Sequence, residues 1–327
     1  MRNHLTSLAS AAGLAAVLLP PVSARHPFAD DCRALASACA TAAPRGLASR
    51  RDGRANGALG SDFQARDDSA ISRTLHFAGS GERTLDVRTI HGSIRVVGTD
   101  RSDVQLDVRK TIRAKTDADL DAAERDVVLD IVDNAARLEA IVRQPDGSPC
   151  GEESGRRGRW QDPAYVVTFD FTIQIPRGTR LRLCTVNGRE VLLTGTRGSF
   201  ELDNVNGRIT MEDVHGSGSA RTINGAIVAS FSERPRAATG FKTTNGNVIV
   251  AFPADLAADL KMKTFNGGLF TDFDVEPLPQ LAAVAERRDG RFVFRSNQFT
   301  LVRAGGGGPE LTFETFNGNV RVLRAAR

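Results

Sequence analysis

The sequence predicts an all-β fold, namely a flattened, single-stranded parallel β-solenoid with two strands per rung, one short N-terminal helix and one hairpin. Three observations predict it. An Asn-Gly corner recurs along the chain, its spacing is nearly constant, and apolar residues take matching positions on both sides of it. We expect the coil to be right-handed, because parallel crossovers prefer that hand.

The recurring element is an octet built on T-x-N-G. Asn-Gly is a strong turn signal, because Gly takes a positive φ without cost and Asn tolerates one. The sequence therefore predicts a tight corner at which Asn needs a positive φ. Looser copies begin at Thr89, where His91 replaces Asn, and at Asp213. The six corner pairs are Asn187 and Gly188, Asn206 and Gly207, Asn224 and Gly225, Asn245 and Gly246, Asn266 and Gly267, and Asn317 and Gly318.

The spacing of the octets indicates a stacked array. From Asn187 to Asn266 successive asparagines are 19, 18, 21 and 21 residues apart, and Asn317 follows after 51. A period near 20 is typical of repeats that bury their apolar faces only by stacking. The apolar positions that would stack are Ile94, Ile209, Ile227, Val248, Leu269 and Val320 after the corner, and Val87, Leu183, Leu202, Ala220, Phe241, Met262 and Phe313 before it.

The column of asparagines has two interpretations. It is either a row of amides that faces a ligand, or an internal ladder in which each side chain bonds to backbone or to the next Asn. We favour the ladder, because the corner geometry already accounts for Asn. The threonines that precede the corners receive the same structural interpretation; they are Thr89, Thr185, Thr222, Thr243, Thr264 and Thr315.

The first 70 residues do not read as part of the solenoid. Residues 1–24 are typical of a secretory signal peptide, with Arg2, an apolar run and a Val-Ser-Ala cleavage site. An uncleaved anchor is the alternative. Residues 25–70 predict a disordered tether whose arginines could touch a membrane surface peripherally. We therefore expect an exported protein, either periplasmic or at the cell surface or extracellular.

The folded part is expected over 71–327, with insertion loops at 144–163 and 274–309. A strand over "VQLDVRKTIRA" precedes a short helix whose N-cap is Thr116 or Asp117, and a hairpin follows. Second corners fall near residues 194, 213, 232 and 253, where Gly and Pro gather. "ELTFETFNGNVRVL" is the last rung, and we expect it to form the open edge of the stack.

The cysteines and the net charge limit which ligands and cofactors the chain is expected to bind. Cys32, Cys39, Cys150 and Cys184 allow three pairings, of which Cys32–Cys39 with Cys150–Cys184 is the simplest. Their spacing does not suit zinc, so no metal or cofactor is expected. The net charge is +4, with one Trp and one Tyr, and we expect no nucleic-acid partner. The candidate contact residues in the first insertion loop, which could equally be an ordinary solvated loop, are Arg156, Arg157, Arg159 and Trp160.

Three segments together resemble the bacterial putative-adhesin family, a domain of unknown function. They are "FTIQIPRGTRLRLCTVNGREVLL", the T-x-N-G octets and "GGPELTFETFNGNVRV". The resemblance covers roughly residues 80–327 and implies a β-solenoid, an extracytoplasmic or membrane-associated setting, an association with envelope-stress operons and no established catalysis. The chain departs from the family pattern in its Cys-containing loop and at 274–309.

We therefore expect a non-catalytic envelope protein, a rigid solenoid that acts as adhesin, scaffold or envelope-stress sensor component. Its partner would be an envelope component, a polysaccharide or a protein, and the open edge would allow end-to-end self-association. The alternative is a polysaccharide-active β-helix enzyme, a lyase or hydrolase, since fold alone does not decide function. Glycoside hydrolysis needs two nearby carboxylates. The candidate pairs are Asp203 with Glu212 or Asp213, and Asp272 with Asp274. Asp203 and Asp213, however, are half a rung apart and are expected on opposite sides, and Asp272 and Asp274 fall where a strand gives way to a loop, a common place for solvated acids.

Overall fold

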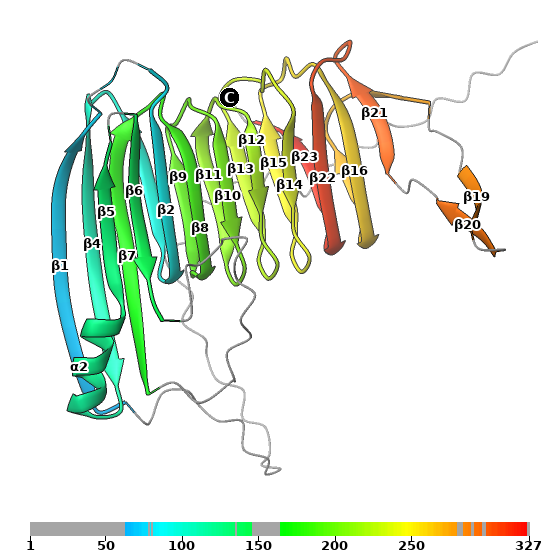
Figure 1. Cartoon of the computed structure of the whole chain (residues 1–327). Helices are drawn as coiled ribbons and strands as arrows, with labels where there is room; N and C mark the ends of the chain where they lie inside the picture. The colour runs from blue at the N-terminus through cyan, green and yellow to red at the C-terminus, as the bar shows by residue number, and fades with distance from the viewer. Residues whose placement is uncertain are drawn as a thin grey trace, which may run out of the picture. The chain divides into compact units, whose positions relative to one another are not determined.

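The computed structural model describes residues 63–77, 79, 81–134, 136–145, 164–279, 284–288, 291–295 and 299–325. All of them belong to the unit Ala58–Arg327. The predicted signal peptide, most of the predicted tether and most of the loop at 144–163 lie outside the described residues. The described part is mostly β, with one helix, two large sheets and a two-stranded sheet of β19 (Val284–Arg288) and β20 (Arg291–Arg295) (Figure 1).

Sheet A has ten strands. Its strands are parallel from β7 to β17, whereas β4 and β1 run antiparallel to their neighbours. The order across sheet A is β1 (Ala65–His76), β4 (Asp103–Ala114), β7 (Tyr165–Pro176), β3 (Ile94–Thr99), β9 (Glu190–Thr194), β11 (Arg208–Val214), β13 (Ile227–Phe231), β15 (Val248–Phe252), β23 (Val320–Arg324) and β17 (Leu269–Thr271).

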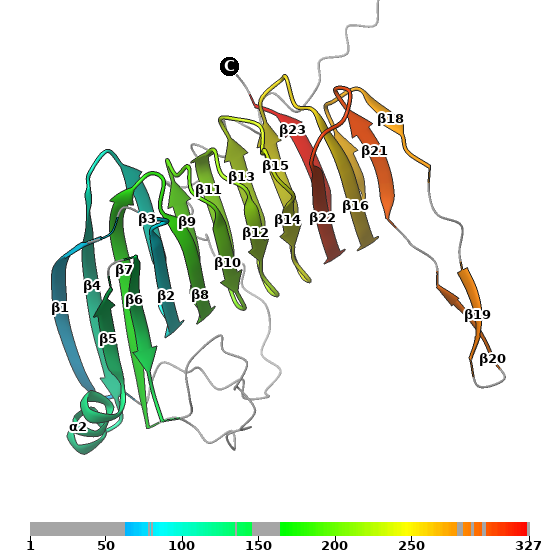
Figure 2. The ribbon, with the colours of Figure 1, turned by 45° about the horizontal axis from the view of Figure 1, so that its top comes forward.

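Sheet B has eleven strands and lies face to face with sheet A (Figure 2). Its central strands, from β6 to β16, are parallel. The order across sheet B is β18 (Val275–Pro277), β21 (Thr300–Ala304), β16 (Ala258–Asn266), β22 (Glu310–Asn317), β14 (Thr239–Lys242), β12 (Gly218–Arg221), β10 (Phe200–Asn204), β8 (Arg180–Asn187), β2 (Thr84–His91), β6 (Arg137–Arg143) and β5 (Val128–Asp133).

Both sheets are mixed: their central strands pair in parallel, and antiparallel pairing at the ends goes beyond the one expected hairpin. In the centre the chain crosses from sheet B to sheet A at every Asn-Gly corner and returns to sheet B at the second corner. Strands of neighbouring units therefore run in the same direction within each sheet. At the ends consecutive strands stay within one sheet, as in the β5–β6 hairpin, and a tight turn then forces antiparallel pairing. The hairpin itself was predicted and is confirmed.

The predicted apolar columns form the core between the sheets. The residues before and after the corners are buried, and equivalent residues pair in register, for example Ile209 with Ile227 and Val248 with Val320. Aromatic rings stack within the columns, with 5.5 Å between the centroids of Phe241 and Phe313. Each fully buried side chain of this size contributes about 1.5–3 kcal/mol. Leu269 is only partly buried, because β17 ends sheet A.

The corner glycines are required by close packing between units rather than by a positive φ at Asn. Among the described residues other than Gly, only Asp213 has a positive φ, so the predicted positive φ at Asn is wrong. A Cβ on Gly225 would lie 2.1 Å from the carbonyl oxygen of Gly207. The threonine row donates to the carbonyls of the corner glycines in the neighbouring unit. The hydroxyl of Thr243, for example, donates to Gly225 O at 2.8 Å. Equivalent bonds run from Thr185 to Gly92, Thr222 to Gly207, Thr315 to Gly246 and Thr264 to Gly318.

The last octet does not form the edge of the stack, contrary to expectation. The pair β22–β23 lies between β14–β15 and β16–β17, as both views show (Figures 1 and 2). The edge unit is therefore β16–β17. The octets share one pattern, so their order along the chain does not fix their order in the stack. Part of that insertion extends sheet B, since β21 pairs antiparallel with β16 and β18 pairs antiparallel with β21.

The N-terminal boundary also differs from the predicted one at Ile71. Strand β1 begins at Ala65, inside the predicted tether, and pairs with β4 along its whole length. This edge strand is mostly exposed and polar, so it lacks the apolar alternation that would reveal it. The helix α2 (Asp117–Asp126) is confirmed, with Thr116 as N-cap, whose hydroxyl accepts from Asp119 N at 3.2 Å.

We predict that Gly225→Ala destabilises the fold by about 1–3 kcal/mol, because the added methyl group would overlap the Gly207 carbonyl. Urea unfolding measures the change. Gly240→Ala is the matched control, since a Cβ there meets nothing within 4 Å. Equal stability of the two variants would contradict the close-packing explanation.

Candidate functional site

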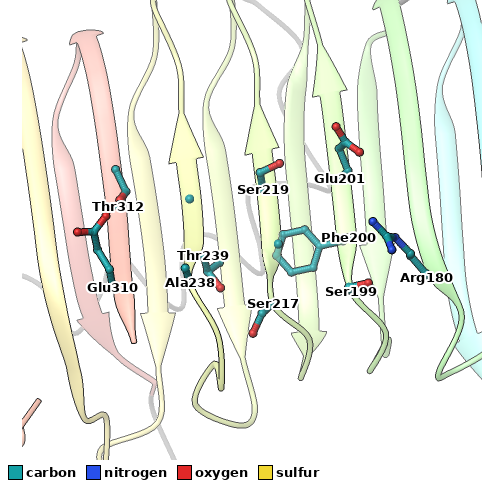
Figure 3. Close-up of a pocket in the computed structure, with 12 residues that line it drawn as sticks. Arg180, Ser199, Phe200, Glu201, Ser217, Ser219, Ala238, Thr239, Glu310 and Thr312 are labelled. Carbon is teal, nitrogen blue, oxygen red and sulfur yellow. Dashed lines mark hydrogen bonds between the residues drawn. The ribbon is translucent and has the colours of Figure 1, made fainter. Parts of the chain in front are cut away.

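A groove of about 410 Å³ crosses the outer face of sheet B. Its floor consists of small residues on and beside β12 and β14, including Ser217, Ser219 and Gly240. Glu201 stands on the β10 side and Glu310 on the β22 side (Figure 3). The groove therefore runs across the strands, along the direction in which the units stack.

Strand register creates this groove. One cross-strand row of outward positions contains Glu201 on β10, Ser219 on β12, Gly240 on β14 and Thr312 on β22. Two neighbouring units thus place short side chains between longer ones. Gly240 leaves open space above its Cα. The sequence did not predict this site, whose only signal is the small residues before two successive corners, "SGSA" and "AATG".

The charged groups beside the groove are largely paired with one another. Arg182 Nε donates to Glu201 Oε2 at 3.1 Å. On the other side, Lys261 Nζ lies 3.4 Å from Glu310 Oε1. Because these charges neutralise each other and the floor offers hydroxyl groups, the groove suits a polar ligand that forms hydrogen bonds rather than a highly charged one.

Two arrangements of carboxylates occur around the groove. Glu201 and Glu310 lie three strand spacings apart, roughly 14 Å, which exceeds the separation used by glycosidases. Glu201 and Asp203 lie two residues apart on one face of β10. Asp203 makes no hydrogen bond or ion pair with a described residue. Burial raises the pKa of Asp203 above its ordinary value and the Glu201 charge adds to this, while Arg221 and Arg182 oppose it.

The carboxylate pairs expected from the sequence are not brought together as proposed. Asp203 lies in sheet B, whereas Glu212 and Asp213 lie on β11 in sheet A, as expected for Asp203 and Asp213 from their half-rung separation. Asp272 and Asp274 both contact Arg324, through its backbone N–H and its guanidinium, each at 3.2 Å. That shared partner indicates a structural role.

The six asparagines of the octets form one continuous row of side-chain hydrogen bonds. In the order of the stack they are Asn187, Asn206, Asn224, Asn245, Asn317 and Asn266, and each Nδ2 donates to the preceding Oδ1 at 2.7–2.8 Å. The row lies on the surface. The sequence anticipated such bonds, but not that Asn317 would stand between Asn245 and Asn266.

The remaining predicted site residues are largely outside the described residues. Cys184 is disulfide-bonded. Cys32, Cys39, Cys150, Arg156, Arg157, Arg159 and Trp160 are not described.

A second cluster surrounds His215 at the opposite corner. Its Nε2 lies 3.3 Å from Asp213 Oδ1, and its Nδ1 lies 3.1 Å from Glu233 Oε1 without good hydrogen-bond geometry. The Ser232 hydroxyl donates to Asp213 rather than to His215, so these groups do not form a nucleophilic relay. The bond from Ser232, helped by His215, lowers the pKa of Asp213, and contact with His215 lowers that of Glu233. Glu233 comes from the next unit, so sequence reasoning missed this contact.

Metal and membrane features can be assessed only for the described residues. In them, no group of three or more His, Cys, Asp or Glu side chains is placed to bind a metal ion. None of their helices is long and apolar enough to cross a membrane.

Comparison with known proteins gives little guidance. No protein-family model matches the chain, and no curated protein matches it. Among solved structures it is similar to a crystal structure of a putative cell adhesion protein from Clostridium sporogenes, with a TM-score of 0.38 and 10% identity over 79% of this chain and 100% of that one. A likeness this weak supports no argument, so function must be inferred from the residues of this chain.

We predict that Asn245→Val lowers the free energy of unfolding by about 1–2 kcal/mol, because it removes one donated and one accepted ladder bond. Chemical denaturation tests this. Thr244→Val, at the adjacent position, is the control and should be neutral. An unchanged midpoint for Asn245→Val would show that the ladder adds no stability.

The His215 cluster should make stability sensitive to acid. The folded-state pKa values of Asp213 and Glu233 are lowered, so their contribution is complete above their unfolded values of about 4 and disappears as the pH falls through the folded values. Ser232→Ala removes the largest cause at Asp213. Its Tm should therefore fall less steeply than that of the wild type between about pH 5 and about pH 2. Ser219→Ala should behave as the wild type, and parallel curves for all three proteins would rule out this linkage.

Proposed function

We propose that the chain is a non-catalytic binding scaffold of the cell envelope, a flattened β-solenoid whose sheet-B groove binds an extended polar polymer such as a polysaccharide. The observation that carries the proposal is the groove itself. It crosses five parallel strands in register, with a floor of small, hydroxyl-bearing residues and paired charges beside it.

The solenoid is part of this proposal. Seven strand–corner–strand units, from β2–β3 to β16–β17, alternate between the sheets and pair in parallel with their neighbours. The Thr-to-Gly bonds and the asparagine row repeat from unit to unit. A coil with two strands per turn accounts for these features, and its right-handed sense remains our prediction.

The dimensions of the groove favour an extended ligand. From β8 to β22 it spans four strand spacings, roughly 19 Å. A linear polymer lying along this direction would meet hydroxyl groups, backbone and paired side chains in succession. Adhesion, scaffolding and envelope-stress sensing would each use such a surface, and the resemblance to the putative-adhesin family agrees with the first of these.

Export is also part of the proposal. The N-terminal segment has the pattern of a signal peptide, and the disulfide at Cys184 supports an oxidising compartment. We place the protein in the periplasm or on the cell surface.

One observation favours the alternative, a polysaccharide-active enzyme. Asp203 has a raised pKa and no described partner, and Glu201 stands beside it on the same strand face. Two carboxyl groups in unequal environments can act as acid and base. Product release from a glycan, abolished by Asp203→Asn, would establish this function in place of simple binding.

The binding function can be tested with a variant whose new side chain fills the groove. Gly240→Phe adds a ring where a Cβ meets no atom within 4 Å, so the fold should persist while the groove is blocked. We expect glycan fragments from envelope polysaccharide or peptidoglycan to bind about tenfold or more weaker, a change of about 1.4 kcal/mol. Val228→Phe, which places a ring on the outer face of sheet A, is the matched control. Calorimetric titration measures binding, and chromatography of the glycan detects cleavage. Equal affinity of both variants for the glycan would exclude the groove as the binding site.

A further inference from the structure

The corner of β16–β17 differs from the other Asn-Gly corners because, among the described residues, it has a neighbouring corner on one side only. At interior corners the Gly N–H donates to the Asn carbonyl of the next unit, as from Gly225 to Asn245 at 3.0 Å and from Gly246 to Asn317 at 2.9 Å. The Asn N–H of that next unit donates back, as from Asn245 to Ile223 O at 2.8 Å. The same pattern recurs from unit to unit, so each corner is a template for the following one.

At the terminal corner no described residue forms a following unit on this template. The groups that would bind one are the N–H and carbonyl of Gly267, the carbonyl of Phe265 and the Oδ1 of Asn266. On sheet B the pairing of β16 with β21 stops at Met262, so it does not cover the corner. On sheet A nothing among the described residues pairs with the outer edge of β17.

The hydrogen bonds of the asparagine row all point the same way and leave an acceptor at this end. All five amide bonds are donated the same way, and Asn266 donates to Asn317 while its own Oδ1 accepts from no described residue. A chain of such bonds polarises its members, which strengthens the terminal acceptor. Asn266 is therefore prepared to accept from a further amide.

An exposed aromatic ring lies beside these groups. Phe265 is 63% exposed, and one face of its ring stacks on Phe316 with 4.7 Å between centroids and 4° between planes. Its other face is available to the side chain at the same position of a further octet. Burying that ring would add an apolar contribution to the backbone pairing.

The opposite end of the row is closed. His91 takes the place of Asn there, and the Thr89 hydroxyl donates to His91 O within its own corner. Strand β7 lies outside β3, and its backbone is so close that a Cβ on Gly92 would lie 1.9 Å from Phe169 O. Two copies therefore cannot stack head to tail through their corners, and the site at β16–β17 calls for a segment that brings its own free octet.

We propose that the β16–β17 corner docks a T-x-N-G strand–corner–strand segment of another polypeptide, in parallel register, with its Thr beside Thr264 and its Asn beside Asn266. The same corner already binds one such segment on its inner side, since Thr264 pairs with Thr315 and Asn266 with Asn317. Docking of this kind is strand addition, with backbone bonds supplying affinity and the octet supplying specificity. The surface is separate from the groove and does not depend on its function.

The test uses the full chain and a fluorescein-labelled peptide of residues 310–324. Fluorescence anisotropy should show saturable binding of one peptide per chain. Phe265→Lys replaces the exposed ring by a charge and should weaken binding about tenfold or more. Ile223→Lys, at the equivalent and 47% exposed position of an interior corner, should bind as the wild type does. A peptide with Asn317→Asp lacks the amide donor and should bind more weakly.

Two results would overturn the proposal. One is absence of peptide binding by the wild type. The other is equal binding by Phe265→Lys, which would place the peptide in the position of β22–β23 by exchange. Because both substituted side chains are exposed, their variants should fold, and their Tm values check this. If the wild-type chain associates in sedimentation and Phe265→Lys disperses it, the donated segment belongs to a second copy.

Discussion

The close backbone contact at each Asn-Gly corner determines the rest of the structure. With no side chain at Gly225, its unit approaches the Gly207 carbonyl closely, and Thr243 of the following unit donates to the Gly225 carbonyl. These contacts fix the register of one unit on the next. A slip of one residue would turn every buried side chain outward. The apolar columns, the asparagine row and the groove of sheet B all follow from this single register.

Features with a fixed period could be predicted from the sequence. The octets predicted the corners and the apolar columns, and Thr116 predicted the start of α2. Features without a periodic signal could not. Strand β1 is a polar edge strand, and its pairing depends on β4, far away in sequence. The place of β22–β23 could not be predicted, because octets are interchangeable partners and only the path of residues 274–309 distinguishes them. The role of Gly was misread for a similar reason, since its neighbour belongs to another unit.

In the candidate sites, too, contacts between identical residues of the repeat could be predicted, and contacts between unlike residues could not. Identical residues at one position of successive units, such as Asn224 and Asn245, could be expected to meet. The groove depends on Ser219 and Gly240 being both small and side by side, and the His215 cluster on a glutamate from the next unit. Such contacts between unlike residues appear only once the register is known. The separation of Asp203 and Asp213 could be predicted, because ten residues are about half a period and place them on different sheets.

The position of β22–β23 between earlier units has a kinetic consequence. A chain that emerges from its N-terminus can add β8–β9, β10–β11, β12–β13 and β14–β15 one after another, each beside the last. The native neighbours of β16–β17, namely β22 and β23, become available only with residues 310–324, more than 40 residues later. Assembly of this end therefore waits on non-local closure, the slow class of folding event. Meanwhile the edges of β14 and β15 stay open, which makes this interval the time of greatest exposure to mispairing.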